Sequence, residues 1–265
     1  MKKLLAITAL SAALFFGQTA AAEEKAAEEV KPSHVEMVLV LDESGSMSNL
    51  TNDTIGGFNS MIEKEKKLDV DAHVTTVLFN DQYKMLYNRR ELKDVRKMTD
   101  KDYTPGGMTA LLDAVGRTIH KMDMVSGIHR KDKGNKVLFV IITDGEENDS
   151  REYTYADVKK LIKDRQENAG WEFIFLGANI DAVAAAENLG IDRDRAVKYK
   201  NTGSGVRANF KAVAELSDSL AKSGRVSDEW KETVEKDEDD AADKQSAAVT
   251  LHLSLIHISE PTRPY

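Results

Sequence analysis

The chain alternates between two hydrophobic patterns, one typical of buried strands and the other of amphipathic helices. Unbroken apolar runs of strand length occur in "VEMVLVLD" (Val35–Asp42) and "KVLFVIITD" (Lys136–Asp144). Apolar residues spaced along one helical face occur in Asp53–Lys67 and Ala110–Met122. Because strands that are apolar on both faces need cover on both sides, this alternation predicts a mostly parallel sheet between two layers of helices.

The weaker segments extend the same alternation. A short turn separates two of the expected strands, Ala72–Asn80 and Tyr83–Asn88, which favours a hairpin and hence one antiparallel edge strand. We therefore expect a doubly wound α/β fold with a sheet of about six strands and helices on both faces. The other expected elements are strands at Trp171–Asn179 and Ala196–Lys200, and helices after the Thr154-x-x-Asp157 cap, after the Asp181 cap and at Val206–Leu220.

The two ends of the chain differ from this pattern. Residues 1–22 combine Lys2 and Lys3, a short apolar run and small residues before a cleavage point, as in a secretory signal peptide; a membrane anchor is the alternative. We expect a linker at 23–33, the domain at 34–222 and an acidic polar tail at 223–252. Residues 253–265 resemble read-through of a transposon-type sequencing adapter, although a natural β-tail is the alternative. The mature protein is expected to be exported, periplasmic or secreted, without a transmembrane segment.

The composition excludes several kinds of functional site. The formal net charge of −8 argues against a nucleic-acid surface, because phosphate backbones select basic patches. The absence of cysteine excludes disulfides, iron–sulfur clusters, thiolate zinc sites and thiol nucleophiles. With 41% hydrophobic and 31% charged residues, the chain is able to bury a core.

Small oxygen-bearing side chains gather where the expected strands end. Asp42 closes the first long strand and is followed by Ser44 and Ser46, while Asp144 closes the second. Thr109 opens a helix after Gly106 and Gly107, which let the backbone pass close to a ligand. Because ligands of such sheets bind beyond the carboxyl ends of the strands, these oxygens are expected to meet there. All-oxygen sites suit Mg²⁺, Mn²⁺ or Ca²⁺, so we predict one such ion with an open position for an anionic ligand.

The motifs "LVLDESGSMS", "GGMT" and "VIITDGEEN" resemble the metal-ion-dependent adhesion site of von Willebrand factor A domains. The resemblance covers about Val35–Leu220, and its longer phrases look like a bacterial subgroup of small, single-domain members. It implies a protein-binding module rather than an enzyme, in which an Asp or Glu of a protein partner completes the metal shell. It also implies the site residues: Ser44, Ser46 and Thr109 as hydroxyl ligands, with Asp42 and Asp144 acting directly or through water.

Several alternatives remain open. Thr104 competes with Thr109 for the threonine position, and Ser48 is assigned to the turn that follows the site. Met47 and Met108 flank the site and either form an apolar rim or pack inward. The main functional alternative is a metal-dependent hydrolase or phosphotransfer enzyme at the same edge, although no Gly-x-Ser-x-Gly elbow or Walker loop occurs. A third possibility is an envelope-complex subunit in which the ion is structural.

Overall fold

The computed structural model of the chain describes residues 34–68, 70–125 and 135–236. The segments expected to be a signal peptide, a linker and an adapter-derived end lie outside the described residues. Within the part that the structure describes, no helix is both long enough and apolar enough to cross a membrane.

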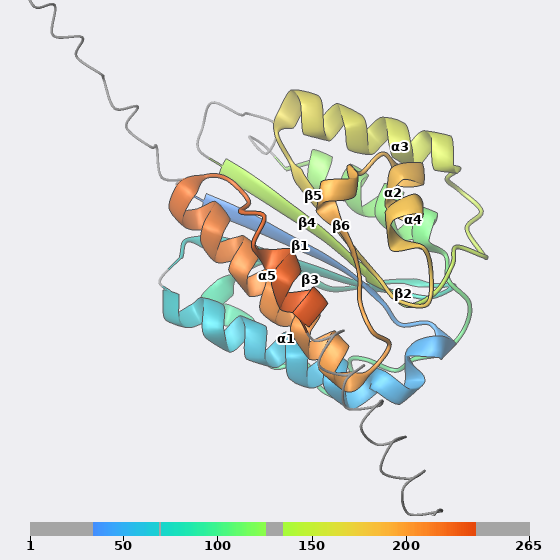
Figure 1. Cartoon of the computed structure of the whole chain (residues 1–265), viewed down its shortest axis with the longest axis horizontal. Helices are drawn as coiled ribbons and strands as arrows, with labels where there is room; N and C mark the ends of the chain where they lie inside the picture. The colour runs from blue at the N-terminus through green and yellow to red at the C-terminus, as the bar shows by residue number, and fades with distance from the viewer. Residues whose placement is uncertain (1–33, 69, 126–134, 237–265) are drawn as a thin grey trace, which may run out of the picture.

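A six-stranded sheet runs through the centre of the domain (Figure 1). Its order is β3-β2-β1-β4-β5-β6, and every pair is parallel except β2–β3, which is antiparallel. The expected hairpin and antiparallel edge strand are therefore confirmed. The strands are β1 (His34–Asp42), β2 (Ala72–Phe79), β3 (Tyr83–Glu91), β4 (Asn135–Thr143), β5 (Glu172–Gly177) and β6 (Ala196–Lys198).

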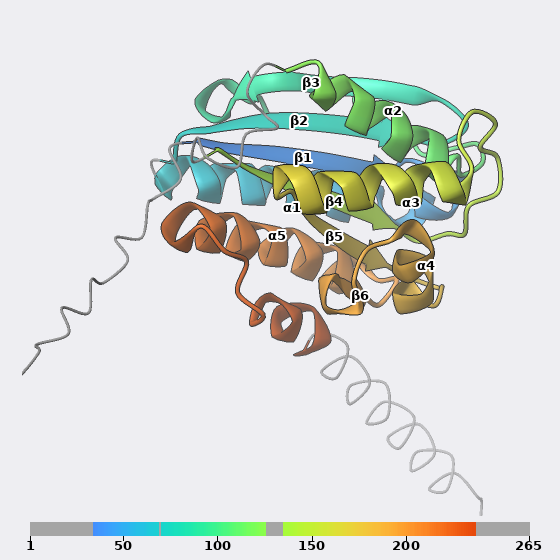
Figure 2. The same ribbon diagram turned by 90° about the horizontal axis from the view of Figure 1, so that it is seen from above.

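Helices cover both faces of the sheet, as the apolar strands require (Figures 1 and 2). One core layer packs α1 and α5 against Met37, Leu39 and Leu41 of β1. The other core layer packs α2, α3 and α4 against the opposite face of the sheet, where the alternate β1 residues Val38 and Val40 point. The helices are α1 (Thr51–Glu65), α2 (Leu111–Asp123), α3 (Tyr155–Asp164), α4 (Ala182–Leu189) and α5 (Gly203–Ser223).

Local signals in the sequence set several helix ends. Thr154 and Asp157 form the expected reciprocal cap at the start of α3, and the Asp181 side chain accepts a hydrogen bond from the Ala184 amide at the start of α4. Gly190 ends α4 in a left-handed conformation, at φ 83°. These interactions satisfy amide and carbonyl groups that a helix end leaves without partners.

The crossing of α1 and α5 depends on the smallness of Gly57. A Cβ built at Gly57 would lie 2.5 Å from Cδ2 of Phe210, whereas one built at its exposed neighbour Gly56 would meet nothing within 4 Å. Both replacements by alanine gain about 1 kcal/mol of helix propensity. Gly56→Ala is therefore expected to stabilise the domain, and Gly57→Ala to destabilise it by about 1–3 kcal/mol through overpacking. Urea unfolding of the two variants measures the difference, and equal stabilisation of both would contradict the close packing of Gly57 against Phe210.

The structure extends the hydrophobic core beyond the expected boundary at residue 222. After Gly224, Val226, Trp230 and Val234 are buried and join the core layer of α1 and α5. Residues 230–236 are helical. Val226, Trp230 and Val234 are spaced four residues apart, as on one face of a helix. The expectation of a polar tail rested on the composition of this segment, which is dominated by charged residues.

Candidate functional site

The carboxyl ends of β1 and β4 bring the first carboxylates together. The two strands are parallel neighbours, with Leu41 paired to Ile142, so Asp42 and Thr143 end at the same level. The Thr143 hydroxyl donates a hydrogen bond to Asp42 Oδ2 at 2.5 Å. Asp144 follows directly, so both aspartates lie at the edge where the sequence placed them.

The chain after β1 folds the two serines toward Asp144. Asp42 Oδ1 accepts a hydrogen bond of 2.7 Å from the Ser44 amide, which tightens the turn. The hydroxyl oxygens of Ser44 and Ser46 are 3.0 Å apart, and the Ser46 hydroxyl donates to Asp144 Oδ1 at 2.5 Å. Ser48 instead donates to the carbonyl of Gly45, in agreement with its assignment to the turn.

Thr109 faces the same point from a second loop. A Cβ built at Gly145 would lie 3.5 Å from Thr109 Oγ1 and 3.8 Å from Ser46 Oγ, so both hydroxyls face Gly145. The Thr109 backbone is fixed on both sides, since its amide donates to Asn148 Oδ1 at 2.9 Å and its carbonyl accepts from the Asn148 amide at 3.0 Å. The structure therefore brings Thr109 together with Asp42, Ser44, Ser46 and Asp144.

Thr104 has a different role. Its amide and hydroxyl both donate to Oε1 of the buried Glu43, and the residue is otherwise exposed. The same loop is joined to the serine loop by hydrogen bonds from the Gly106 amide to the Glu43 carbonyl and from the Gly45 amide to the Gly107 carbonyl. Gly107 adopts a φ of 75°, a conformation that side chains disfavour. The two backbone hydrogen bonds fix the loop after β1, which carries Ser44 and Ser46, relative to the loop that carries Thr109.

The two aspartates form a buried pair of like charges. Asp42 is 1% exposed and Asp144 2%. Burial raises the pKa of Asp42, and the charge of Asp144 raises it further, while hydrogen bonds from Ser44 and Thr143 oppose the shift. Among the described residues, no lysine or arginine forms an ion pair with either carboxylate. A bound cation is the natural counter-charge for such a site.

The donor set fits a hard divalent ion. The converging atoms are carboxylate and hydroxyl oxygens, which are ligands that Mg²⁺, Mn²⁺ and Ca²⁺ prefer. Bonds of 2.0–2.1 Å in an octahedral shell place adjacent oxygens roughly 2.9 Å apart. The 3.0 Å separation between the hydroxyl oxygens of Ser44 and Ser46 is close to that spacing.

Three residues that the sequence did not identify form hydrogen bonds to Asp42 and Asp144. Thr143 orients Asp42, Asn201 donates from Nδ2 to Asp144 Oδ2 at 3.2 Å, and the Tyr103 hydroxyl donates to the Asp42 carbonyl at 2.6 Å. Thr143 directly precedes Asp144, but its contact with Asp42 follows from the pairing of β1 with β4. Asn201 and Tyr103 belong to no spacing motif, so only the tertiary fold identifies them.

The two methionines beside the site differ: one packs inward and the other is exposed at the rim of the site. Met47 is 1% exposed and packs in the core layer of α1 and α5. Met108 is 51% exposed, directly before Thr109. Only Met108 is therefore placed to form an apolar rim.

Comparisons with known proteins agree with the fold. Among solved structures, the chain is similar to the PilB minor pilin from Streptococcus sanguinis, with 12% identity, a TM-score of 0.51, and coverage of 68% of this chain and 60% of PilB. It is also similar to the vWF domain of the type V pili tip protein Mfa5 from Porphyromonas gingivalis, with 12% identity, a TM-score of 0.50, and coverage of 73% and 98%. Proximal thread matrix protein 1 from the mussel byssus matches at 16% identity and a TM-score of 0.49, over 69% of this chain and 46% of that one.

The matches to PilB and the mussel protein thus span less than two thirds of those proteins' lengths. No curated protein matches the chain. The family model for vWA-TerF-like domains, described as the vWA found in the TerF C terminus, matches residues 34–199. This match covers more than half of the chain, and the protein therefore belongs to the vWA-TerF-like family of von Willebrand factor A domains.

Proposed function

We propose that the domain is a cation-dependent protein-binding module. One ion of Mg²⁺, or of Mn²⁺ or Ca²⁺, binds among Asp42, Ser44, Ser46, Thr109 and Asp144, and an acidic side chain of a protein partner completes its shell. The observation that carries this proposal is the convergence of two buried carboxylates and exposed Ser46 at one sheet edge. Membership of the vWA family supports a role in protein interaction.

The hydroxyl-rich shell explains why the ion would seek an outside carboxylate. Three of the proposed ligands are neutral hydroxyls, and the aspartates act directly or through water, so few charged oxygens touch the ion and it remains electron-poor. Because Ser46 is exposed, an open coordination position beside it would be reachable by a partner. A carboxylate in that position gains charge-assisted bonds in a site partly shielded from water.

A hollow beside the site gives the partner a second contact. It has a volume of 290 Å³ and adjoins Gly145. Its lining combines Leu111 and Ile180 with the acidic Glu147 and Asp181. We infer that the partner presents its acidic residue to the ion and apolar or basic side chains to this hollow, since a second acid there would be repelled.

The same site supports a binding role better than the hydrolase alternative. A serine nucleophile needs a base within hydrogen-bond reach. Of the histidines that the structure describes, His34 and His73 lie at the amino ends of β1 and β2, and the exposed His120 lies near the end of α2. The hydroxyls of Ser44 and Ser46 contact each other, and the Ser46 hydroxyl donates to Asp144 Oδ1, so neither contacts any of these histidines.

We further propose that the protein acts outside the cytoplasm. The expected signal peptide supports this, as does the fold shared with a minor pilin and with a pili tip protein.

A paired substitution tests the binding role. Thr109→Val removes the proposed ligand hydroxyl and keeps the side-chain shape, while Thr104→Val removes the competing hydroxyl. The immobilised wild-type domain is expected to capture a partner from envelope extract in Mg²⁺ and release it in chelator. Thr104→Val is expected to behave like wild type, and Thr109→Val to capture at least tenfold less. Capture that survives both chelator and Thr109→Val would overturn the proposal, and serine-dependent turnover of phosphate esters would favour the enzyme.

A further inference from the structure

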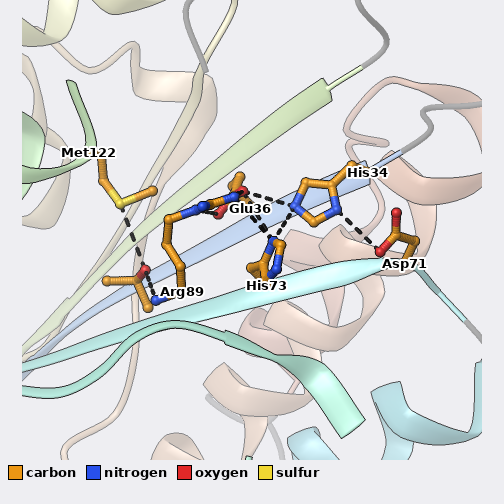
Figure 3. A network of polar contacts seen from close by, with 7 residues as sticks. His34, Glu36, Asp71, His73, Arg89 and Met122 are labelled. Carbon is orange, nitrogen blue, oxygen red and sulfur yellow. Dashed lines mark hydrogen bonds and ion pairs between the residues drawn. The ribbon is translucent and has the colours of Figure 1, made fainter. Parts of the chain in front are cut away.

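A second group of metal-ligating side chains lies at the opposite edge of the sheet, at the amino ends of β1 and β2 (Figure 3). His34 and Glu36 are two residues apart on β1 and so share a face. His73 on β2 is paired with Glu36 in the parallel register. Strand alternation and register therefore place two imidazoles and one carboxylate side by side.

The three ligand atoms face a common point. His34 Nε2 lies 2.8 Å from Glu36 Oε1 and 2.8 Å from His73 Nδ1. His73 Nδ1 lies 3.4 Å from the same Glu36 oxygen. A tetrahedral zinc ion with bonds of 2.0–2.1 Å separates its ligands by roughly 3.3 Å. The triangle therefore needs to open by only a few tenths of an ångström to hold such an ion.

Asp71 holds the His34 ring in an orientation suited to a metal ligand. Asp71 Oδ1 lies 3.3 Å from His34 Nδ1, on the ring nitrogen that faces away from the triangle. A carboxylate on the outer ring nitrogen is the usual support of a metal-bound imidazole, because it fixes the tautomer and ring orientation. The Glu36 side chain is 3% exposed, so its charge also needs a partner at this position.

Arg89 is the present partner of that charge and the competitor for the metal. Its guanidinium donates to both carboxylate oxygens of Glu36, and Nη2 also lies 3.2 Å from His73 Nδ1. Arg89 reaches this point from β3, at φ 48° and beside irregular pairing of Val74 and Thr76 with that strand. Bulges of this kind redirect a side chain. The Arg89 side chain is 32% exposed, so its guanidinium has solvent beside it into which a metal would have to displace it.

We propose that His34 Nε2, His73 Nδ1 and Glu36 Oε1 bind a transition-metal divalent cation of the zinc class, with water in the fourth position. Two imidazole nitrogens and one carboxylate suit zinc, cobalt or copper rather than magnesium or calcium. This site is separate in place and in ligand chemistry from the oxygen site at the carboxyl edge, and it does not depend on the proposed function.

Cobalt(II) titration of the untagged full chain tests this proposal, because tetrahedral nitrogen-bound cobalt absorbs visible light far more strongly than octahedral oxygen-bound cobalt. The wild type is expected to show the intense tetrahedral spectrum, which Zn²⁺ then displaces. His34→Gln and His73→Gln are expected to weaken binding at least tenfold, and His120→Gln, at an exposed histidine, to leave it unchanged. Asp42→Asn is expected to leave the spectrum unchanged, because that residue lies at the other edge.

Arg89→Asn gives a result in the opposite direction. Asparagine tolerates the positive φ at this position and removes the competing guanidinium, so cobalt affinity is expected to rise several-fold. Thermal unfolding of each variant verifies that it folds. Absence of the tetrahedral spectrum in folded wild type, or a spectrum insensitive to both His34→Gln and His73→Gln, would overturn the proposal and leave the group as an ion-pair network.

Discussion

Replacement of Asp42 by asparagine is expected to lower Mg²⁺ affinity at least a hundredfold while leaving the metal-free domain as stable as the wild type or more so. The change removes a carboxylate from the proposed shell, and a hundredfold loss corresponds to about 2.7 kcal/mol. The amide keeps the local geometry, because its oxygen accepts from the Ser44 amide and its nitrogen donates to the Thr143 hydroxyl, the groups that now contact Asp42.

The stability part of this prediction separates a ligand from a structural residue. Without metal, Asp42 and Asp144 are buried like charges, and neutralising one removes their repulsion. Calorimetry measures the affinity, and thermal unfolding with and without Mg²⁺ measures the stability. Asp100→Asn removes a charge from an exposed position and is expected to change neither. Unchanged Mg²⁺ affinity in Asp42→Asn would remove Asp42 from the site.

Replacement of Trp230 by alanine is expected to destabilise the domain by about 3–5 kcal/mol, the usual cost of deleting a large aromatic side chain from a core. Trp230 is 1% exposed and packs with Val226 and Val234 in the core layer of α1 and α5. A loss of this size is a large fraction of the stability of an ordinary domain. The segment after α5 is thus expected to be part of the folding unit.

Urea unfolding followed by circular dichroism measures this effect without relying on tryptophan fluorescence. Glu235→Ala, at an exposed position in the same short helix, is the matched control and is expected to change stability by less than about 0.5 kcal/mol. If Trp230→Ala behaved like the control, the domain would end near Ser223, as its composition suggested.

The fold was largely predictable because its main signals are local. Unbroken apolar strands alternating with one-sided helices leave few arrangements other than a covered parallel sheet. The Thr154 and Asp181 caps and the short turn after Asn80 set element ends through contacts within a few residues. Trp230 escaped prediction because its helical apolar positions are sparse among charged residues.

The sequence predicted which loops form the candidate site, but not which other residues form hydrogen bonds to it. Parallel strands end at a common edge, so Asp42 and Asp144 were expected to meet before any register was known. Asn201 approaches Asp144 from a loop that no motif marks. The grouping of His34 with His73 depends on the register of β1 against β2, which periodicity alone does not provide.

The proposed divalent cation at the carboxyl edge of the sheet would be located by the anomalous scattering of Mn²⁺ in crystals of the domain. A peak is expected within about 2.0–2.3 Å of the hydroxyl oxygens of Ser44 and Ser46, close to Thr109 and the two aspartates, and it is expected to weaken in Asp42→Asn at subsaturating Mn²⁺. No peak at this edge at saturating Mn²⁺, or a peak away from these oxygens, would contradict the proposed site.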